Sequence, residues 1–161
     1  MRHDMIVPVR WMLMGMLVCI IGACSGNSSG GAAAADHPAV TAARLRIQPA
    51  YPDAAKIPVV IVADSVAVGW SYTHNTAVLS VAHINYTDEI ELGCQFLVHE
   101  WVHKTQGKAY YHANRTRGEL EALAAGTECL KIFGAPQGLI AYYVGLDGTH
   151  NAAAVPPYRM R

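Results

Sequence analysis

The apolar positions between residues 57 and 86 follow a β pattern. Residues 57–63 form a run of β-branched and apolar side chains, and residues 65–72 alternate with period two. Residues 76–86 form a third such run, after a turn signal at His74-Asn75. We therefore expect a small antiparallel sheet of about three strands.

The period of the apolar residues becomes helical after the third run. Asp88 or Thr87 can cap a helix of about five turns, and Gly107 marks its end. Residues 116–133 are rich in Ala, Leu and Glu and predict a second helix, and residues 137–146 predict a third. The sequence thus predicts an α+β fold, with the small sheet packed on two consecutive helices.

The chain begins with a basic segment and a short apolar run. Arg2, His3 and Arg10 precede an apolar stretch over residues 11–23, which fits a signal peptide and is short for a membrane span. An alternative is an uncleaved anchor, or ordinary secretion after cleavage near Ala23. Each of these alternatives places the rest of the chain outside the cytoplasm.

The end of the apolar run resembles a bacterial lipobox. The sequence Ile21-Gly22-Ala23-Cys24 has the aliphatic residue, the two small residues and the cysteine of that signal. The resemblance implies cleavage before Cys24, acylation of Cys24 and stable membrane anchoring. Ser25, in place of the aspartate that marks inner-membrane retention, favours the periplasmic face of the outer membrane.

Composition divides the remaining chain into a tether and a domain. We assign residues 1–23 to the signal peptide, residues 24–39 to a Gly/Ser/Ala-rich tether and residues 40–161 to one folded domain. The formal net charge is +0 and no basic run occurs in the mature part, so nothing favours nucleic acid as a partner.

The first long helix carries a pattern typical of zinc sites. His99-Glu100-Trp101-Val102-His103 reads H-E-x-x-H, and two histidines four residues apart lie on one helix face. Both imidazoles can then bind one Zn²⁺ at about 2.0–2.1 Å. Glu100 is placed to act as the base that polarises the attacking water and passes its proton to a leaving amine.

A catalytic zinc ion needs a third protein ligand. A metzincin would have histidine six residues after the motif, where this chain has Ala109, so a glutamate from the second helix is expected. Three glutamates are candidates, namely Glu119, Glu121 and Glu128.

The segment LVHEWVHKTQ…ELEALAAGTECL, within residues 92–133, resembles zincin metallopeptidases of the gluzincin type. The resemblance implies a minimal zincin-like fold, peptide-bond hydrolysis with Zn²⁺, and Glu121 as the third ligand beside His99 and His103. It also implies an edge strand above the cleft, at residues 84–87 or near Val66. Ala125 replaces the aspartate that orients a ligand histidine in the thermolysin type, so Glu128 is a candidate substitute.

Two cysteines of the mature chain are predicted to form a disulfide, and the alternative is two free buried thiols. An exported compartment is oxidising, and Cys94 and Cys129 lie at similar distances along the two helices from the expected ligands. If the helices are antiparallel with Glu121 opposite the histidines, the cysteines meet. Glu119 shifts this match by about half a turn, and Glu128 is incompatible with it.

Further polar residues follow the motif. Gln106 shares a face with His103 and is expected to orient a ligand, touch substrate or cap the helix. Tyr110, Tyr111 and His112 lie between the ligand segments and are candidates for stabilising an oxyanion, or for packing at the rim.

These features predict a lipid-anchored zinc metallopeptidase acting on peptides or proteins of the cell envelope. One alternative is a catalytically inactive zinc-binding or interaction lipoprotein of the same fold. Another is a hydrolase of amide bonds in cell-wall peptides.

Overall fold

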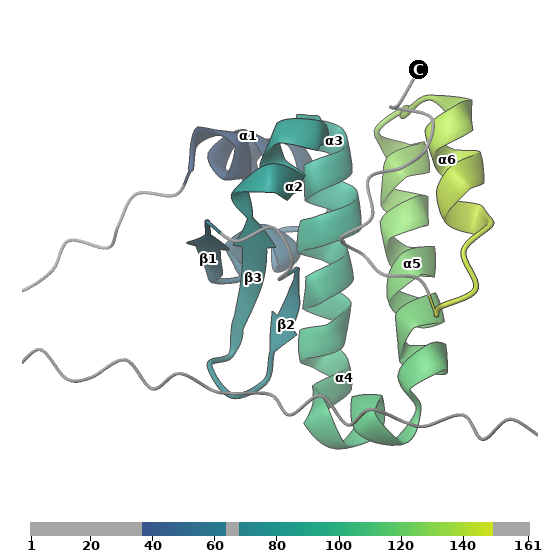
Figure 1. Ribbon diagram of the computed structural model, residues 1–161. Helices are drawn as coiled ribbons and strands as arrows, with labels where there is room; N and C mark the ends of the chain where they lie inside the picture. Colours follow the sequence, from purple (N-terminus) through teal and green to yellow (C-terminus); the bar gives the residue numbers. More distant parts are fainter. Residues whose placement is uncertain (1–36, 64–67, 150–161) are drawn as a thin grey trace, which may run out of the picture. The chain divides into compact units, whose positions relative to one another are not determined.

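Three short strands lie beside two long helices in the computed structural model, which describes residues 37–63 and 68–149 (Figure 1). The strands are β1 (Val59–Val62), β2 (Gly69–Ser71) and β3 (Thr76–Ser80), in the order β1-β3-β2. The predicted α+β class is confirmed. Within the described ranges, no helix is long and apolar enough to span a bilayer.

The sheet is mixed, and the prediction of a purely antiparallel sheet was wrong. β2 pairs antiparallel with β3, opposing Trp70 to Ala77, whereas β1 runs parallel to β3, opposing Val59 to Ala77. Parallel neighbours need a connection of about a dozen residues or more, and residues 63–75 provide that length between β1 and β3.

Only the first half of the third apolar run, residues 76–80, forms a strand. β3 ends at Ser80, whose hydroxyl accepts a hydrogen bond from the His83 amide at 3.1 Å and caps helix α2 (Val81–Tyr86). Residues 84–87 therefore form no edge strand. The alternating pattern continued into a short helix that begins at a serine cap.

The motif helix is continuous as far as Gly107 and changes its type twice before that point. It runs through α3 (Glu89–Leu92), a π-helical segment η2 (Gly93–Val98) and α4 (His99–Ala113). The Asp88 side chain accepts a hydrogen bond from the Glu91 amide at 2.8 Å and caps the start. Gly107, at φ 74° and ψ 157°, breaks the helix where its end was predicted. The helix then resumes in a new direction up to Ala113.

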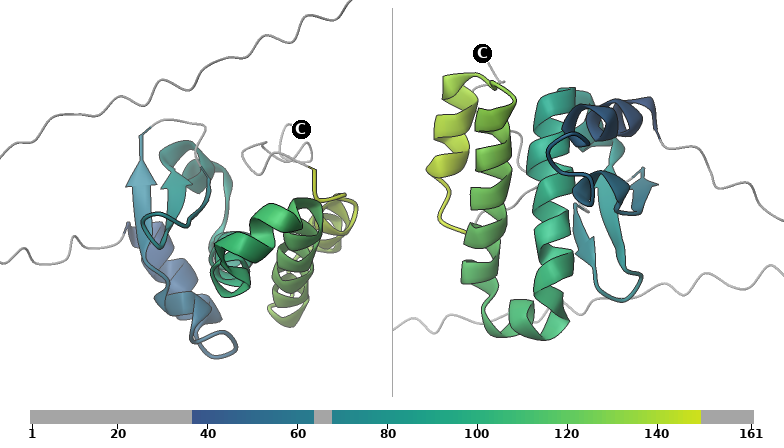
Figure 2. Two further views of the ribbon diagram at one scale, coloured as in Figure 1. Left: turned by 90° about the horizontal axis from the view of Figure 1, so that it is seen from below. Right: turned by 180° about the vertical axis from the view of Figure 1, so that it is seen from behind.

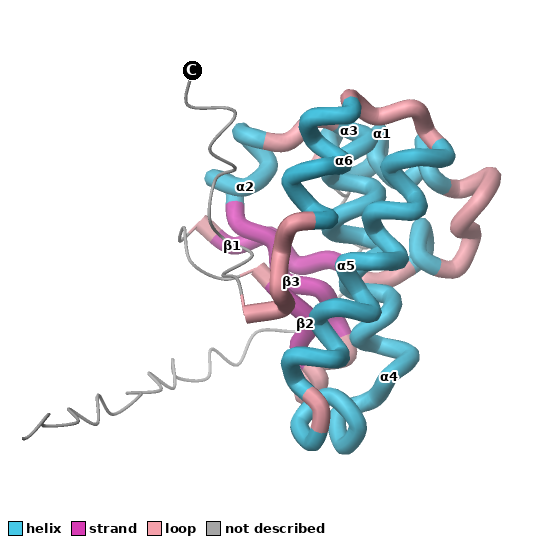
Figure 3. The backbone as a smooth tube through the Cα atoms, turned by 90° about the vertical axis from the view of Figure 1, so that its right-hand side faces the viewer, coloured by secondary structure: helices cyan, strands magenta, loops and turns pink. Residues whose placement is uncertain are grey.

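Two further helices follow the motif helix. Asn114 joins α4 to α5 (Arg115–Ile132), which returns antiparallel to α4, and α6 (Gln137–Val144) packs on the far side of α5. Figure 2 shows the resulting order of sheet, α4, α5 and α6, and Figure 3 shows α5 and α6 in front of the sheet. The predicted second and third helices are confirmed.

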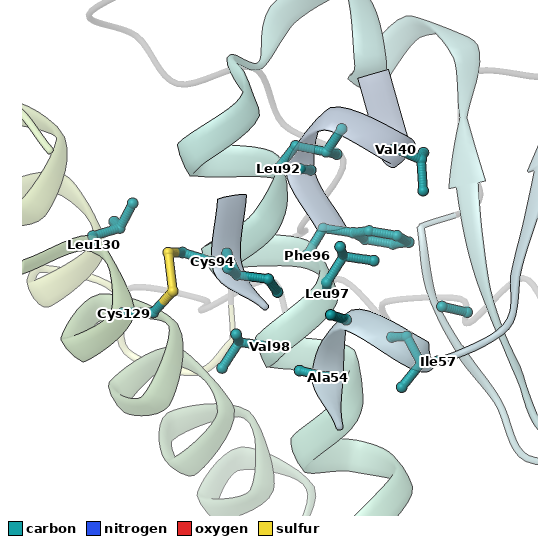
Figure 4. Close-up of a cluster of buried hydrophobic side chains, with 14 of the residues drawn as sticks. Val40, Ala54, Ile57, Leu92, Cys94, Phe96, Leu97, Val98, Cys129 and Leu130 are labelled. Atoms are coloured by element: carbon teal, nitrogen blue, oxygen red, sulfur yellow. A yellow bond between two sulfur atoms is a disulfide. The ribbon is translucent and has the colours of Figure 1, made fainter. Parts of the chain in front are cut away.

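The core lies between the motif helix, the sheet and the first helix, α1 (Pro38–Ile47), with a 3₁₀ turn η1 (Ala54–Lys56) closing one side. Phe96 and Leu97 point from η2 toward Val40 and Ile57 (Figure 4). Burying a side chain of this kind contributes roughly 1.5–3 kcal/mol.

The predicted disulfide between Cys94 and Cys129 is confirmed. It joins η2 to α5 with a Cα–Cα distance of 5.3 Å, and both cysteines are fully buried (Figure 4).

The N-terminal predictions fall mostly outside the described residues. The signal peptide, Cys24 and most of the tether lie within residues 1–36. The last two residues assigned to the tether, Pro38 and Ala39, already belong to α1, because His37 caps that helix and proline is well suited to its first position.

Candidate metal centre

Three side chains from α4 and α5 bring their metal-binding atoms together. The Nε2 atoms of His99 and His103 lie 3.0 Å apart, and Glu119 Oε2 lies 3.4 Å from the first and 3.5 Å from the second. These three donors form a group that can hold a metal ion. Both histidines are buried, and the glutamate side chain is 17% exposed.

The spacing of these donors fits a small tetrahedral ion. Ligand bonds of about 2.0–2.1 Å at tetrahedral angles place neighbouring donor atoms roughly 3.3–3.4 Å apart. The three separations between the donor atoms, 3.0, 3.4 and 3.5 Å, scatter around that value. Two imidazoles and one carboxylate are also a common ligand set of catalytic zinc, so the residues fit this ion.

The preference for Glu121 as third ligand was wrong. The structure brings Glu119 to the histidines, while the Glu121 carboxylate accepts hydrogen bonds from Tyr110, at 2.8 Å, and from Arg117 and Gln106, each at 3.0 Å. Residues two apart on a helix point in nearly opposite directions, so only one of the two can face the histidines. Glu128 is exposed on the outside of α5, where it pairs with Lys131.

Glu100 lies beside the donor group as the motif predicts. The residue is 2% exposed, and among the described residues its Oε2 has no hydrogen-bond partner. Burial raises the pKa of Glu100, and the neighbouring His99 and His103 offset part of that rise. A buried carboxylate with one unpartnered oxygen and a raised pKa has the properties of a general base.

Tyrosine and glutamine side chains hold two of the three donors. Tyr111 donates a hydrogen bond from its hydroxyl to Glu119 Oε1, and its ring packs edge-on against His103. His103 Nδ1 lies 3.0 Å from Gln106 Oε1, so Gln106 contacts one of the two motif histidines. Burial alone would raise the pKa of Glu119, but hydrogen bonds with His103, His99 and Tyr111 lower it well below its usual range.

The remaining candidates lie farther from the donors. Tyr110 bonds to Glu121 on the outer side of the helix pair. His112 is exposed, and its ring lies 6.2 Å from the ring of Tyr72. Neither residue lines the cavity over the donor group.

A cavity of about 540 Å³ opens over the donor group. Val68, Gly69 and Trp70 of the β2 segment line it, and so do Arg115 at the start of α5 and Thr149. Because β2 is an end strand in the order β1-β3-β2, it presents one edge without a strand partner among the described residues.

Sequence reasoning missed Tyr72, which also lines this cavity. Its hydroxyl donates to the His103 carbonyl oxygen at 3.1 Å and ties the β2–β3 turn to α4. Burial, with Tyr111, Glu100 and Glu119 adding to it, raises the pKa of Tyr72 to about 12. The period-two alternation already placed Tyr72 on one face with Val68 and Trp70, and this face could have been recognised. Arg115 carried no comparable signal, because the turn after α4 positions it.

Comparisons with protein-family models, with curated proteins and with solved structures gave no match for this chain. The assignment of the site therefore depends on its own geometry and chemistry.

Proposed function

We propose that this protein is a zinc-dependent hydrolase of peptide bonds, with His99, His103 and Glu119 as the metal ligands and Glu100 as the base. The observation that carries the proposal is the juxtaposition of three donor atoms at 3.0, 3.4 and 3.5 Å with the buried, unpartnered Oε2 of Glu100. Bound zinc supplies a Lewis acid that polarises the substrate carbonyl and lowers the pKa of a water.

The side chains of the cleft have distinct roles in this proposal. Glu100 accepts a proton from the attacking water and delivers it to the leaving amine, since both steps need one buried group that changes its protonation. Tyr111 holds the Glu119 carboxylate. The edge of β2 offers backbone N–H and C=O groups that an extended peptide can pair with. This favours an extended peptide over a folded protein as the substrate.

The metal content of the purified full-length protein tests the ligand set. We expect one zinc per chain in the parent, and loss of most zinc in His103→Ala and Glu119→Gln. Glu128→Gln is the matched control, because it makes the same change at an exposed position of the same helix. A parent chain that takes up no zinc after reconstitution would contradict the proposal.

Hydrolysis is tested with Glu100→Gln. This variant should keep its zinc but lose roughly 10²–10⁴-fold in rate on an unfolded protein or peptide library, because it removes the proton acceptor. Parallel incubation with peptidoglycan fragments separates a general peptidase from a hydrolase of cell-wall peptides. Zinc binding without any hydrolysis in the parent would favour the inactive zinc-binding alternative.

We also propose that the chain is anchored to the cell envelope through lipid on Cys24 and acts on peptides or proteins there. The support is the sequence of the lipobox-like segment. Cys24→Ala should move the protein from the membrane fraction to the soluble fraction of its host and abolish incorporation of radiolabelled palmitate. Unchanged labelling in that variant would refute the anchor.

A further inference from the structure

The side-chain amide of Gln106 lies between α4 and α5, and each of its ends has defined partners. Its Oε1 is 3.0 Å from His103 Nδ1. Its Nε2 donates to the Glu121 carboxylate at 3.0 Å and to the Gly118 carbonyl oxygen at 3.1 Å. One amide thus connects a proposed zinc ligand to a carboxylate that does not itself reach the site.

The partners on α5 fix the orientation of this amide. A backbone carbonyl oxygen and an ionised carboxylate can only accept hydrogen bonds, so both must face the NH₂ group of Gln106. A flipped amide would place its own oxygen against two acceptors. The Glu121 carboxylate is in turn held in place by Tyr110 and Arg117.

The orientation of the amide determines which nitrogen of His103 carries hydrogen. Because Gln106 Oε1 can only accept, the hydrogen of the 3.0 Å contact must be on Nδ1. A neutral imidazole protonated at Nδ1 has a free lone pair at Nε2. That Nε2 is the atom that lies 3.5 Å from Glu119 Oε2 within the donor group.

Gly118 provides the space for this arrangement. A Cβ atom at that position would lie 3.2 Å from Gln106 Oε1 and 3.1 Å from the Tyr111 ring. Glycine lets the glutamine amide approach the backbone of α5 closely enough to bond to its carbonyl oxygen.

We propose that Gln106 and Glu121 are positioning residues that fix His103 as its Nδ1–H tautomer and so keep its Nε2 available to the metal. The inference rests on the proposed function, since it assigns a role toward zinc. Ligand histidines usually donate to a carboxylate, a carbonyl or water. Here the carboxylate acts through an intervening amide.

Zinc affinity of the full-length, chelator-stripped protein is the first test, measured by competition with a chromophoric chelator. Gln106→Leu should weaken zinc binding roughly 10–100-fold, because it removes the acceptor for Nδ1–H. Glu121→Gln should weaken binding less, about 2–10-fold, because Gly118 still holds one N–H of the amide. Glu128→Gln is the control and should bind like the parent.

Gln106→Met is a second variant, because it keeps most of the side-chain volume but has no strong acceptor for Nδ1–H. Its zinc affinity should fall at least as far as that of Glu121→Gln. A Gln106→Met variant that binds zinc like the parent would overturn the proposal. This comparison remains decisive if Gln106→Leu does not fold.

The tautomer itself is read from ¹⁵N–¹H spectra of His103 in the metal-free protein, at a pH where its imidazole is neutral. The parent should show hydrogen on Nδ1, and Gln106→Leu should show a mixture or the Nε2–H form. Parent-like affinity and tautomer in Gln106→Leu would refute the inference. Absence of zinc binding in the parent would refute the proposed function instead, and the spectra would still decide the tautomer.

Discussion

Glu119 and Glu121 show how the position of a residue along a helix decides which partners its side chain meets. Cys129 lies ten residues after the first and eight after the second, which places it about 80° from each around the helix, on opposite sides. The disulfide therefore cannot distinguish the two glutamates. The chain on both sides of Gly107 does, because Gln106 before it and Tyr110 after it bond to Glu121, and Glu119 is the glutamate that faces the histidines.

The hydroxyl of Tyr111 offers a test at the residue scale. Tyr111→Phe removes the donor to Glu119 Oε1 while keeping the ring that packs on His103. Loss of a hydrogen bond of this kind costs about 1 kcal/mol, so zinc binding should weaken roughly fivefold. Tyr86→Phe is the control, because Tyr86 is exposed on α2. Equal zinc affinities in the two variants, measured by chelator competition, would show that the hydroxyl does not hold the ligand.

At the scale of elements, the π-helical segment η2 aligns the disulfide with the metal ligands. Cys94 and His99 are five residues apart, which in an α-helix separates their side chains by about 140°. A π-helix has i→i+5 hydrogen bonds and therefore more residues per turn than an α-helix, so it brings these two side chains closer to one face. Both then face α5, where Cys129 and Glu119 are located.

The break in α4 gives a prediction about stability. Gly107 has φ 74° and ψ 157°, close to a conformation that is essentially restricted to glycine, so Gly107→Ala should destabilise the fold by roughly 1–3 kcal/mol. A Cβ atom would meet nothing there within 4 Å, so the cost is one of backbone conformation alone.

Gly138→Ala is the matched control for this break. Gly138 is the second residue of α6 and has equally open surroundings, so alanine there should stabilise by roughly 0.4–1 kcal/mol, because it reduces the conformational entropy of the unfolded chain. Urea unfolding of both variants should thus give changes of opposite sign. A Gly107→Ala variant as stable as the parent would show that the backbone conformation at residue 107 does not require glycine.

At the scale of the whole folded unit, α5 is tied to the motif helix at both ends. Asn114 joins the helices at one end and the Cys94–Cys129 bond joins them near the other, with the donor group between. Most of the apolar core lies on the other side of the motif helix, toward α1 and the sheet. The position of Glu119 relative to the histidines therefore depends strongly on the connection at Asn114 and on the disulfide.

Removal of the disulfide tests this dependence. The bond spans a sequence separation of 35 residues, and closing a loop of that size stabilises the folded state by about 3–4 kcal/mol in the chain-entropy estimate. Cys94→Ala with Cys129→Ala should lower the free energy of unfolding by about that amount and weaken zinc binding. Unfolding measured with and without a reductant on the parent provides the comparison. Unchanged zinc affinity in a destabilised but folded variant would show that packing alone positions α5.

The sequence predicted the helices better than the sheet, for reasons visible in particular residues. Caps and breaks at Asp88 and Gly107 act locally, so their effect on the helix can be predicted from neighbouring residues. The parallel placement of β1 depends on a partner far along the chain, and period two contains no information about direction. Ser80 ended β3 within a run that still alternated.

For the site, the sequence predicted the motif residues and left the third ligand open among three glutamates. The motif encodes its own geometry, since four residues make one turn. The placement of Glu119 depends on the π-helical segment, which no sequence pattern predicted, and on the path that the chain takes after the predicted break at Gly107. The alternation along residues 68–72 gives the face on which Tyr72 lies, but it does not show that this face meets His103, 31 residues farther along the chain.

The disulfide also affects how the protein would bind and release a metal ion. His99, His103 and Glu119 all lie between Cys94 and Cys129 in the sequence, so the S–S bond closes a covalent ring that contains every proposed ligand. The oxidised protein is then a macrocyclic chelator, and the reduced protein is an open-chain one. Even when the fold opens locally, the three donor groups stay on one closed loop. Their local concentration around a released ion consequently stays high, which favours recapture over escape.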